Sequence, residues 1–314
     1  MKKILIVGAG GQIGSELVTY LRGLYGNGNV VAADLRQSER LAADGPFEIL
    51  DALDAERYAE LVRKYGIDSI FNLAALLSAK GEANPTLAWK INIGALTNSL
   101  EVARQYNCAL FTPSSIGAFG GDFPRDNTPQ DTIMQPNTMY GVCKVTGELL
   151  SNYYHTRFGV DTRSVRFPGI ISNVTLPGGG TTDYAVEIYY AAVKGERFVC
   201  PVSSNVYMDM MYMPDALRAT VELMEADPAK LKHRNSFNIA SMSFTPEIIY
   251  AEIRKRLPEF EMVYDVDPVR EAIAESWPNK LDDTCAREEW GWKPQWDLSS
   301  MTDDMLRAVR AKNL

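Results

Sequence analysis

Residues 8–14 have the sequence Gly-Ala-Gly-Gly-Gln-Ile-Gly, and this stretch decides the fold class. The apolar run Lys3–Val7 before it predicts a buried strand, and the amphipathic segment Ile13–Leu24 after it predicts a helix. Glycines in such a turn let the backbone approach a pyrophosphate, whose charge then lies at the helix N-terminus. The alternative is a glycine-rich turn without a ligand. The turn predicts a dinucleotide site that includes Gly8, Gly11, Gln12, Ile13 and Gly14.

An acidic residue supports the dinucleotide interpretation. Asp34 ends the next predicted strand, Val30–Asp34, twenty residues after Gly14. A carboxylate at this position can accept hydrogen bonds from both ribose hydroxyls of NAD and would repel the 2′-phosphate of NADP. Arg36 lies close enough to leave NADP open, but we expect the carboxylate to dominate and NAD to be the cofactor.

Residues after the third and fourth predicted strands extend this site. Asp51 follows the strand Phe47–Leu50 and is placed either to reach the adenine edge or to cap the next helix, a role for which Asp54 competes. Small residues at the end of the strand Ser69–Leu73 leave room for a cofactor at the same edge of the sheet. The cofactor-binding candidates therefore also include Leu73, Ala74 and Ala75.

The first half of the chain alternates short apolar runs with amphipathic stretches, which indicates βαβ units and a parallel sheet. The further strands that we predict are Ala109–Pro113 and Asp161–Arg166, and the further helices are Ala55–Tyr65, Pro85–Gln105 and Tyr140–Arg157. The predicted fold class is α/β, a doubly wound Rossmann sheet with a smaller, interleaved C-terminal substrate lobe.

The pattern changes after Pro168. A loop rich in Gly and Pro, Leu176–Gly180, precedes a predicted helix at Asp183–Lys194, and Ser236–Ile239 predicts a strand that can return to the main sheet. The other elements predicted here are the strand Arg197–Cys200 and the helices Pro214–Glu225, Thr245–Leu257, Val269–Glu275, Thr284–Trp290 and Met301–Lys312. We expect a nucleotide-binding domain over residues 1–167, with returning segments near 205–240, and a substrate lobe over 168–204 and 241–314.

Composition argues against several classes of protein. A net charge of −8 and a pI near 5.0, without a basic tail or stripe, argue against a nucleic-acid partner. No stretch approaches the roughly 18 apolar residues of a membrane span, and no signal peptide precedes the first strand, so we expect no membrane partner and a cytoplasmic protein. The four cysteines and two histidines form no CxxC or HxxxH pattern, so we expect free thiols and no metal site.

A candidate catalytic pair lies on a predicted helix. Tyr140 and Lys144 are one helical turn apart on the same face. Tyrosine is a poor base at neutral pH, but a neighbouring ammonium and a nearby NAD⁺ ring favour its phenolate. Ser114 and Ser115, after the fifth predicted strand, can supply a hydroxyl that holds a substrate oxygen. Together with the glycine turn and with Asn92 on the intervening helix, the pair predicts an oxidoreductase site.

These residues, in this order, resemble the extended short-chain dehydrogenase/reductase family over essentially the whole chain. The matching residues are Gly8, Gly11, Gly14, Asp34, Asn72, Leu73, Ala74, Ala75, Ser115, Tyr140 and Lys144. The resemblance implies that Tyr140 is the acid/base, that Lys144 also binds the nicotinamide ribose, and that Ser115 orients the reacting oxygen. The segment 166–169 resembles the one that passes under the nicotinamide, which makes Pro168 a cofactor-binding candidate, as is Asn92.

Several segments, most of them after residue 168, resemble the short-chain type of L-threonine 3-dehydrogenase. The segments that carry this resemblance are 114–120 (SSIGAFG), 177–186 (PGGGTTDYAV), 242–246 (MSFTP), 276–278 (SWP) and 282–292 (DDTCAREEWGW). The reaction that the resemblance implies is oxidation of the β-hydroxyl of L-threonine by NAD⁺ to 2-amino-3-ketobutyrate, with no zinc.

Threonine would need donors for its carboxylate and an acceptor for its ammonium. Thr181 and Thr182 offer hydroxyls, whereas Asp183 offers a negative charge or caps the helix that follows. Ser78 is a further donor, and Trp277 either closes over a small substrate or packs in the core. The substrate-binding candidates are Ser78, Ser115, Tyr140, Thr181, Thr182, Asp183 and Trp277.

Two other functions compete with this one. A sugar-nucleotide 4-epimerase or dehydratase shares the catalytic residues but must bind a nucleoside diphosphate, for which Arg197 and Arg218 are available. The third hypothesis is a catalytically silent NAD-sensing or scaffold protein. A silent protein would have no need for the complete set of Ser, Tyr and Lys, which counts against this hypothesis.

The family resemblance also suggests a homodimer. Its interface would be a four-helix bundle made from the helices near Pro85–Gln105 and Tyr140–Arg157 of each copy. Apolar side chains that can contribute are Leu87, Ile91, Leu149 and Tyr153, although these positions can also face their own sheet.

Overall fold

The computed structural model describes residues 1–175 and 180–312. The strands of the main sheet are β1 (Ile4–Val7), β2 (Val30–Asp34), β3 (Phe47–Ile49), β4 (Ser69–Asn72), β5 (Ala109–Phe111), β6 (Ser114–Ser115), β7 (Thr162–Phe167) and β11 (Asn235–Asn238). They pair in the order β11-β7-β5-β4-β1-β2-β3, with β6 beside β7, and every pairing is parallel. The structure therefore confirms the predicted doubly wound parallel sheet.

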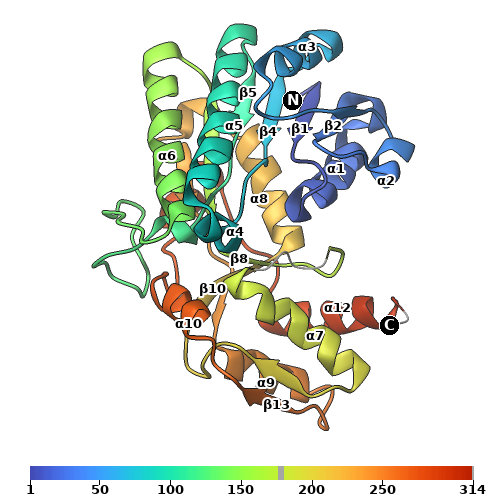
Figure 1. Cartoon of the computed structure of the whole chain (residues 1–314), viewed down its shortest axis with the longest axis vertical. Helices are drawn as coiled ribbons and strands as arrows, with labels where there is room; N and C mark the ends of the chain where they lie inside the picture. Colours follow the sequence, from blue (N-terminus) through green and yellow to red (C-terminus); the bar gives the residue numbers. More distant parts are fainter. Residues whose placement is uncertain (176–179, 313–314) are drawn as a thin grey trace.

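Helices cover both faces of this sheet (Figure 1). One face carries α3 (Ala55–Tyr65), α5 (Pro85–Tyr106) and α6 (Met139–Phe158), and the other carries α1 (Gln12–Tyr25), α8 (Met213–Glu225) and α11 (Thr284–Trp290). The short helices α2 (Glu39–Ala43) and α4 (Ser78–Ala83) follow β2 and β4. Since the layers enclose the sheet, its strands bury side chains on both faces, as their nearly continuous apolar sequences require.

Strand β1 shows how the two faces are filled. Its residues Ile4 and Ile6 belong to the core beneath α1 and α8, whereas Leu5 and Val7 belong to the core beneath α3 and α5. All four side chains are at most 1% exposed. Successive side chains of a strand point to opposite faces, so four consecutive apolar residues contribute two side chains to each core. The strand ends at Val7, and the glycine turn begins directly after it.

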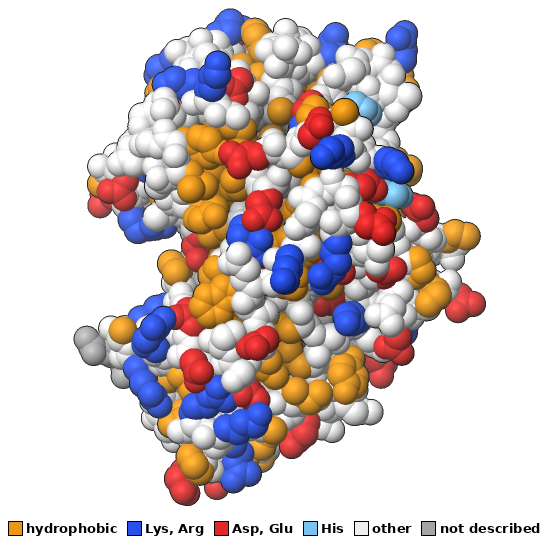
Figure 2. Space-filling view, turned by 180° about the vertical axis from the view of Figure 1, so that it is seen from behind, with side chains coloured by type: hydrophobic (Ala, Val, Ile, Leu, Met, Phe, Trp, Pro, Cys, Tyr) orange, Lys and Arg blue, Asp and Glu red, His pale blue; other side chains and the backbone are white. Residues whose placement is uncertain are grey.

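A second, smaller lobe lies below the main domain in Figure 1. Its strands are β8 (Gly169–Ile171), β9 (Phe198–Cys200), β10 (Met208–Tyr212), β12 (Met242–Phe244) and β13 (Met262–Tyr264), which form a three-stranded sheet β12-β10-β8 and a two-stranded sheet β13-β9. Its helices are α7 (Tyr184–Lys194), α9 (Pro246–Arg254), α10 (Pro268–Glu275) and α12 (Leu298–Arg310). The lobe has its own apolar core, and seen from behind the surface is indented between the two parts (Figure 2).

The chain crosses between the two parts more than once. Strand β10 lies in the sheet of the smaller lobe, but α8 directly after it packs on the main sheet and β11 pairs with β7. Within the returning segment predicted near 205–240, α8 and β11 therefore pack with the main domain, and β10 pairs within the smaller lobe.

Helix starts follow their capping residues, and the start of α12 differs most from the sequence prediction. Helix α12 begins at Leu298, because the Asp297 side chain accepts a hydrogen bond from the backbone of Ser300, whereas we predicted a start at Met301. Helix α6 begins one residue before Tyr140, because Thr138 accepts a hydrogen bond from the backbone of Gly141. Among the described residues, no helix combines the length and the apolar character that a membrane crossing requires.

A buried carboxyl group in β10 makes stability depend on pH. Asp209 is fully buried, its Oδ2 accepts a hydrogen bond from the backbone N–H of Leu281 (2.8 Å), and burial raises its pKa to about 8. Because the pKa is higher in the folded than in the unfolded chain, this group's stabilising contribution is present below about pH 4 and is lost as the pH rises through about 8.

We predict that the substitution Asp209→Asn removes this loss of stability at high pH, because asparagine cannot ionise. The free energy of unfolding of the wild type should fall relative to that of Asp209→Asn between pH 5 and pH 8.5, as measured by urea denaturation. A difference between the two proteins that is the same at both pH values would contradict the prediction.

Candidate active site

The glycine turn between β1 and α1 packs directly against the end of β4. Gly8 has φ of +81°, and a Cβ atom on it would lie 2.7 Å from the backbone nitrogen of Ala74. A Cβ atom on Gly14 would lie 2.3 Å from the carbonyl oxygen of Gly8. Side chains at these two positions would therefore force the turn away from the sheet and from the N-terminus of α1, where a pyrophosphate is held in such folds.

Asp34, at the end of β2, closes the other side of the turn. Its Oδ2 accepts a hydrogen bond from Gly10 N (2.8 Å) and its Oδ1 accepts one from Arg36 N (3.3 Å). A groove of about 800 Å³ runs past this carboxylate, with Gly8 and Gly11 in its floor. The groove also borders Asp51, Leu73, Ala74, Ala75, Lys80 and Ile91.

Two residues predicted for this site have structural contacts of their own. Asp54, not Asp51, caps α3, since its side chain accepts a hydrogen bond from Arg57 N (3.0 Å). Asp51 accepts one from Leu53 N (2.9 Å) and borders the groove. Asn92 bonds to both the N–H and the carbonyl of Leu76, at 2.7 and 3.1 Å, so it holds the loop after β4 in place.

Tyr140 and Lys144 lie in the first two turns of α6. The Nζ of Lys144 donates a hydrogen bond to the carbonyl of Pro113 (2.7 Å) and lies 5.3 Å from the centre of the Tyr140 ring. A Cβ atom on Gly117 would lie 3.2 Å from that ring, so glycine there lets the tyrosine approach the segment after β6. The structure thus brings the predicted pair together with the carboxyl ends of β5 and β6.

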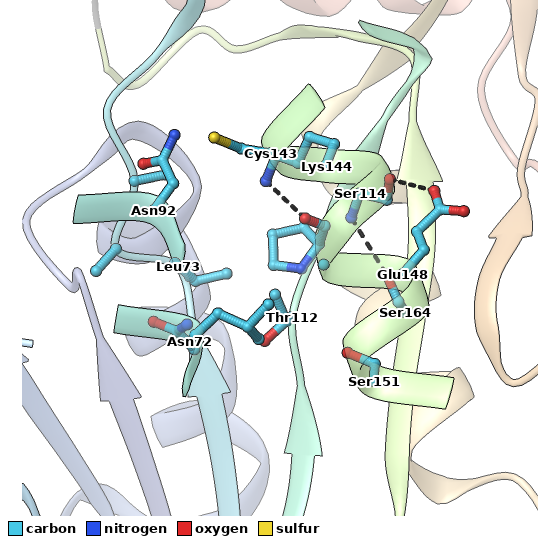
Figure 3. Close-up of a pocket in the computed structure, with 15 residues that line it drawn as sticks. Asn72, Leu73, Asn92, Thr112, Ser114, Cys143, Lys144, Glu148, Ser151 and Ser164 are labelled. Carbon is cyan, nitrogen blue, oxygen red and sulfur yellow. Dashed lines mark hydrogen bonds between the residues drawn. The ribbon is translucent and has the colours of Figure 1, made fainter. Parts of the chain in front are cut away.

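The two serines of β6 point to different places. Ser115 borders the same cavity as Tyr140, and its Oγ accepts a hydrogen bond from Gly117 N (3.1 Å). Ser114 is buried, and its Oγ donates a hydrogen bond of 2.5 Å to Oε1 of Glu148 (Figure 3). Neighbouring residues of a strand face opposite sides. Of the two serines, Ser115 is therefore the one placed to contact a substrate.

Behind Lys144 lies a charged network that sequence reasoning missed. Arg166 makes two hydrogen bonds to Glu148, at 3.0 and 2.8 Å, and both side chains are 6% exposed. Arg166 also donates to the carbonyl of Gln130 (2.8 Å) and to Oδ1 of Asn238 (2.9 Å). Glu148 lies one helical turn after Lys144. The spacing of Tyr140, Lys144 and Glu148, four residues apart each, was the available signal.

Figure 3 shows the small cavity of about 40 Å³ that this network borders, between β4, β5 and β7 on one side and α5 and α6 on the other. Lys144, Cys143 and Asn92 point into it from the helices, and Asn72 and Thr112 from the strands. The side-chain oxygens of Asn72 and Thr112 have no protein partner there. The space suits a few water molecules, which need roughly 10–15 Å³ each.

A separate cavity of about 140 Å³ lies between the two lobes, around Tyr140 and Ser115. The other predicted site residues that border it are Gln12, Ile13, Ser78, Pro168, Thr181, Thr182, Asp183 and Trp277. The predicted loop residues Pro177, Gly178 and Gly179 lie outside the described residues. The structure thus gathers residues from β6, α6, the end of β7 and the second lobe at one place.

The second-lobe residues of this cavity are held in different ways. Asp183 accepts a hydrogen bond from the backbone N–H of Gly180 (2.5 Å), which fixes the turn before α7. Trp277 is 7% exposed and packs with Ile116 and Phe119, so it serves the core as well as the cavity wall. Thr181 is also buried.

The described residues that border this cavity include no lysine or arginine. Arg197 lies at a different cavity, with Leu257 and Phe260. Arg218 bonds to Asp215 and Glu222 and stacks on Trp292. Neither of the arginines considered for a nucleoside diphosphate therefore faces Tyr140.

Comparison with known proteins gives a family. The pattern of the NAD dependent epimerase/dehydratase family matches residues 4–240. An uncharacterized epimerase/dehydratase of Staphylococcus aureus (strain MRSA252) is 57% identical over 100% of this chain and 98% of its own length. The chain belongs to this family.

Solved structures add a narrower likeness. The L-threonine dehydrogenase of Clostridium difficile is 56% identical, with a TM-score of 0.98 over 99% of this chain and 98% of that chain. A monomeric L-threonine 3-dehydrogenase from a metagenome database, in its apo form, is 43% identical, with a TM-score of 0.95 over 99% of this chain and 100% of that one. The likeness to these dehydrogenases covers both lobes.

The residues around the glycine turn fit the dinucleotide that the family binds. The close approach of Gly8 and Gly14 to neighbouring backbone leaves the N-terminus of α1 open to a pyrophosphate. Asp34 supplies a hydrogen-bond acceptor at the end of β2, as a ribose diol requires. The chain thus belongs to an NAD-dependent family, and its groove has the matching chemistry.

We predict that Asp34→Ala weakens NAD⁺ binding by roughly 10- to 100-fold, the loss expected for hydrogen bonds to a charged group. It should also narrow the preference for NAD⁺ over NADP⁺, because a negative charge no longer opposes a 2′-phosphate. Dissociation constants from calorimetry would measure both effects, with the exposed Asp44→Ala as the control. An unchanged preference would show that Asp34 is not the ribose ligand.

We predict that Glu148→Gln lowers the free energy of unfolding by about 3–5 kcal/mol, because Arg166 would keep a buried charge without its counter-ion. Glu60→Gln is the control, since Glu60 pairs with Arg57 while 53% exposed and such pairs contribute about 0–1 kcal/mol. Urea denaturation measures both changes. Equal effects of the two substitutions would contradict a special role for the buried pair.

Proposed function

We propose that the protein oxidises the β-hydroxyl of L-threonine to 2-amino-3-ketobutyrate, with NAD⁺ as hydride acceptor. The observation that carries the proposal is the small cavity that joins Tyr140 and Ser115 to Thr181, Thr182 and Asp183. It lies beside the long groove that fits a dinucleotide. The likeness to L-threonine dehydrogenases over the whole chain supports the same substrate.

In this proposal Tyr140 takes the hydroxyl proton of threonine. The positive charge of Lys144 lies 5.3 Å from the ring centre, where it stabilises negative charge on the phenol oxygen during the reaction, and the carbonyl of Pro113 fixes the position of that charge. Ser115 donates a hydrogen bond to the reacting oxygen, and its own Oγ is held by a hydrogen bond from the backbone N–H of Gly117. When bound, NAD⁺ supplies the acceptor for the hydride that leaves Cβ.

The other end of the substrate is polar and small. Thr181 and Thr182 are placed to donate hydrogen bonds to the threonine carboxylate, with Ser78 on the opposite wall. Asp183 contributes a negative charge at the cavity, which favours an ammonium group. Trp277 closes the cavity on its apolar side and keeps water from the reacting atoms.

The cavity argues against a sugar nucleotide as substrate. A nucleoside diphosphate needs cationic partners, and the described cavity residues provide no lysine or arginine. The family also contains epimerases and dehydratases, as its description states, so the comparison by itself leaves both activities open. A catalytically silent protein would have no need for the intact arrangement of Tyr140, Lys144 and Ser115.

Absorbance of NADH at 340 nm tests the proposal directly. The purified protein should form NADH with L-threonine and NAD⁺, and form none with UDP-sugars. Absence of threonine-dependent NADH formation would overturn the proposal, and conversion of a UDP-sugar to its 4-epimer would establish the alternative.

We predict that Tyr140→Phe lowers turnover by at least about 100-fold, because it removes the general base. NAD⁺ binding should stay nearly intact, since the ring remains. Tyr153→Phe, on the exposed face of the same helix, is the control and should retain activity. Steady-state kinetics and calorimetric NAD⁺ titration measure the two properties, and loss of NAD⁺ binding in Tyr140→Phe would indicate a structural role instead.

We also propose that two copies pair through α5 and α6. Leu149 and Tyr153 on α6 are 64% and 54% exposed, and Leu87 on α5 is 41% exposed, so these helices carry an apolar outer face. Ile91, which we also considered for this face, borders the nucleotide groove instead. A similar L-threonine 3-dehydrogenase is described as monomeric. The proposal of a dimer therefore rests on the apolar outer face of α5 and α6, and not on the comparison.

We predict that Leu149→Glu converts the dimer to a monomer, because it places a charge in the centre of the apolar face. Light scattering coupled to gel filtration measures the mass. The control is Val269→Glu, because Val269 is 68% exposed but belongs to α10 and not to α5 or α6. A wild type that already elutes as a monomer, or a mutant that stays dimeric, would contradict the proposed interface.

A further inference from the structure

Three potential metal ligands meet at the edge of the main domain, away from the Tyr140 cavity. His233 lies just before β11, and Cys285 and Glu289 lie on α11. One ligand atom from each residue lies within 4.8 Å of the other two. Cys285 and Glu289 are four residues apart on a helix, which places both side chains on one face, toward the histidine.

The carboxylate of this cluster is held in place by the backbone. Oε2 of Glu289 accepts hydrogen bonds from the N–H groups of Lys232 (2.5 Å) and His233 (3.1 Å). Its Oε1 is hydrogen-bonded to Nδ1 of the His233 ring. The carboxylate and the imidazole therefore already face each other in a fixed arrangement, with one proton between them.

A second carboxylate lies on the other side of the ring, where it can orient the imidazole. Oδ2 of Asp131 is 3.6 Å from Nε2 of His233. The Asp131 side chain is 90% exposed, whereas those of His233 and Glu289 are 27% and 9% exposed. His233 and Glu289 thus form a partly buried side of the cluster, and the exposed Asp131 forms an acidic side that is open to solvent. Both histidines, in pale blue, are visible in Figure 2, and acidic side chains border one of them.

We propose that His233, Cys285 and Glu289 bind a thiophilic divalent cation such as Zn²⁺ through Nδ1 of the histidine, with Asp131 beside the opposite ring nitrogen, Nε2. One sulfur, one imidazole nitrogen and carboxylate oxygens are the donors that zinc takes, at about 2.0–2.3 Å each. The cation replaces the proton between Nδ1 and Oε1, and this proton and that of the Cys285 thiol pass to solvent. The inference does not depend on the proposed reaction.

The cation would join parts of the chain that are distant in sequence. It connects α11 directly to the start of β11, and the imidazole of His233 connects this site to Asp131, which lies beside Nε2. The neighbouring residue Gln130 accepts a hydrogen bond from Arg166 and donates one from Nε2 to the carbonyl of Ser236 (2.8 Å). Binding should therefore stabilise the loop that borders the buried charge network.

Cobalt is the most informative probe, because a Co²⁺–thiolate bond gives a charge-transfer absorption in the near ultraviolet. Tag-free protein treated with EDTA should bind one Co²⁺ per chain with this absorption, and Zn²⁺ should abolish it by displacement. Cys285→Ser should remove the absorption, and His233→Gln should weaken Zn²⁺ binding by at least about tenfold. Zn²⁺ should also raise the Tm of the wild type, and raise it less in Asp131→Asn.

Matched controls are available in the chain. Cys200→Ser removes a buried thiol that donates to the carbonyl of Val202, and His155→Gln removes the other histidine. Both should keep the absorption and the affinity of the wild type. The proposal is overturned if the wild type shows no saturable one-to-one binding, or if the absorption survives in Cys285→Ser. It is also overturned if His155→Gln loses affinity as much as His233→Gln.

Discussion

The buried ion pair between Arg166 and Glu148 is the interaction on which the arrangement of the site depends. Two charges that are 6% exposed are stable only if each has a full set of partners, and the fold supplies them. Ser114 donates to Glu148, and Gln130 and Asn238 accept from Arg166. The pair thereby ties α6, β6, β7, β11 and the segment before α6 to one another.

This constraint explains the geometry of the catalytic residues. Ser114 is used to satisfy Glu148, so the neighbouring Ser115 faces the other way, toward Tyr140. Lys144 lies on α6 between Tyr140 and Glu148, and its Nζ is held by the carbonyl of Pro113, which follows β5. Short strands, one helix and one buried charge pair thus set the positions of hydroxyl, phenol and ammonium before any ligand binds, which reduces reorganisation during the reaction.

The local part of this arrangement was predictable from sequence, and the tertiary part was not. The glycine turn, Asp34 and the spacing of Tyr140 and Lys144 depend on a few consecutive residues, so the sequence is sufficient to predict their elements. The choice between Ser114 and Ser115 depends on which face of β6 meets α6. The partners of the buried pair come from segments far apart in the sequence, because Glu148 accepts from Ser114 and Arg166 donates to Gln130 and Asn238. The strands β8 and β12, with three residues each, are too short to show a pattern.

In the proposed reaction, a hydride leaves Cβ of threonine in the cavity at Tyr140 and passes to the nicotinamide of NAD⁺. The most direct measurement uses L-threonine deuterated at C3, with the reduced cofactor examined by mass spectrometry and proton NMR. We expect one deuterium in each NADH formed, on a single face of the nicotinamide ring. Reduced cofactor without deuterium, or deuterated threonine that is consumed with no reduced cofactor, would contradict it.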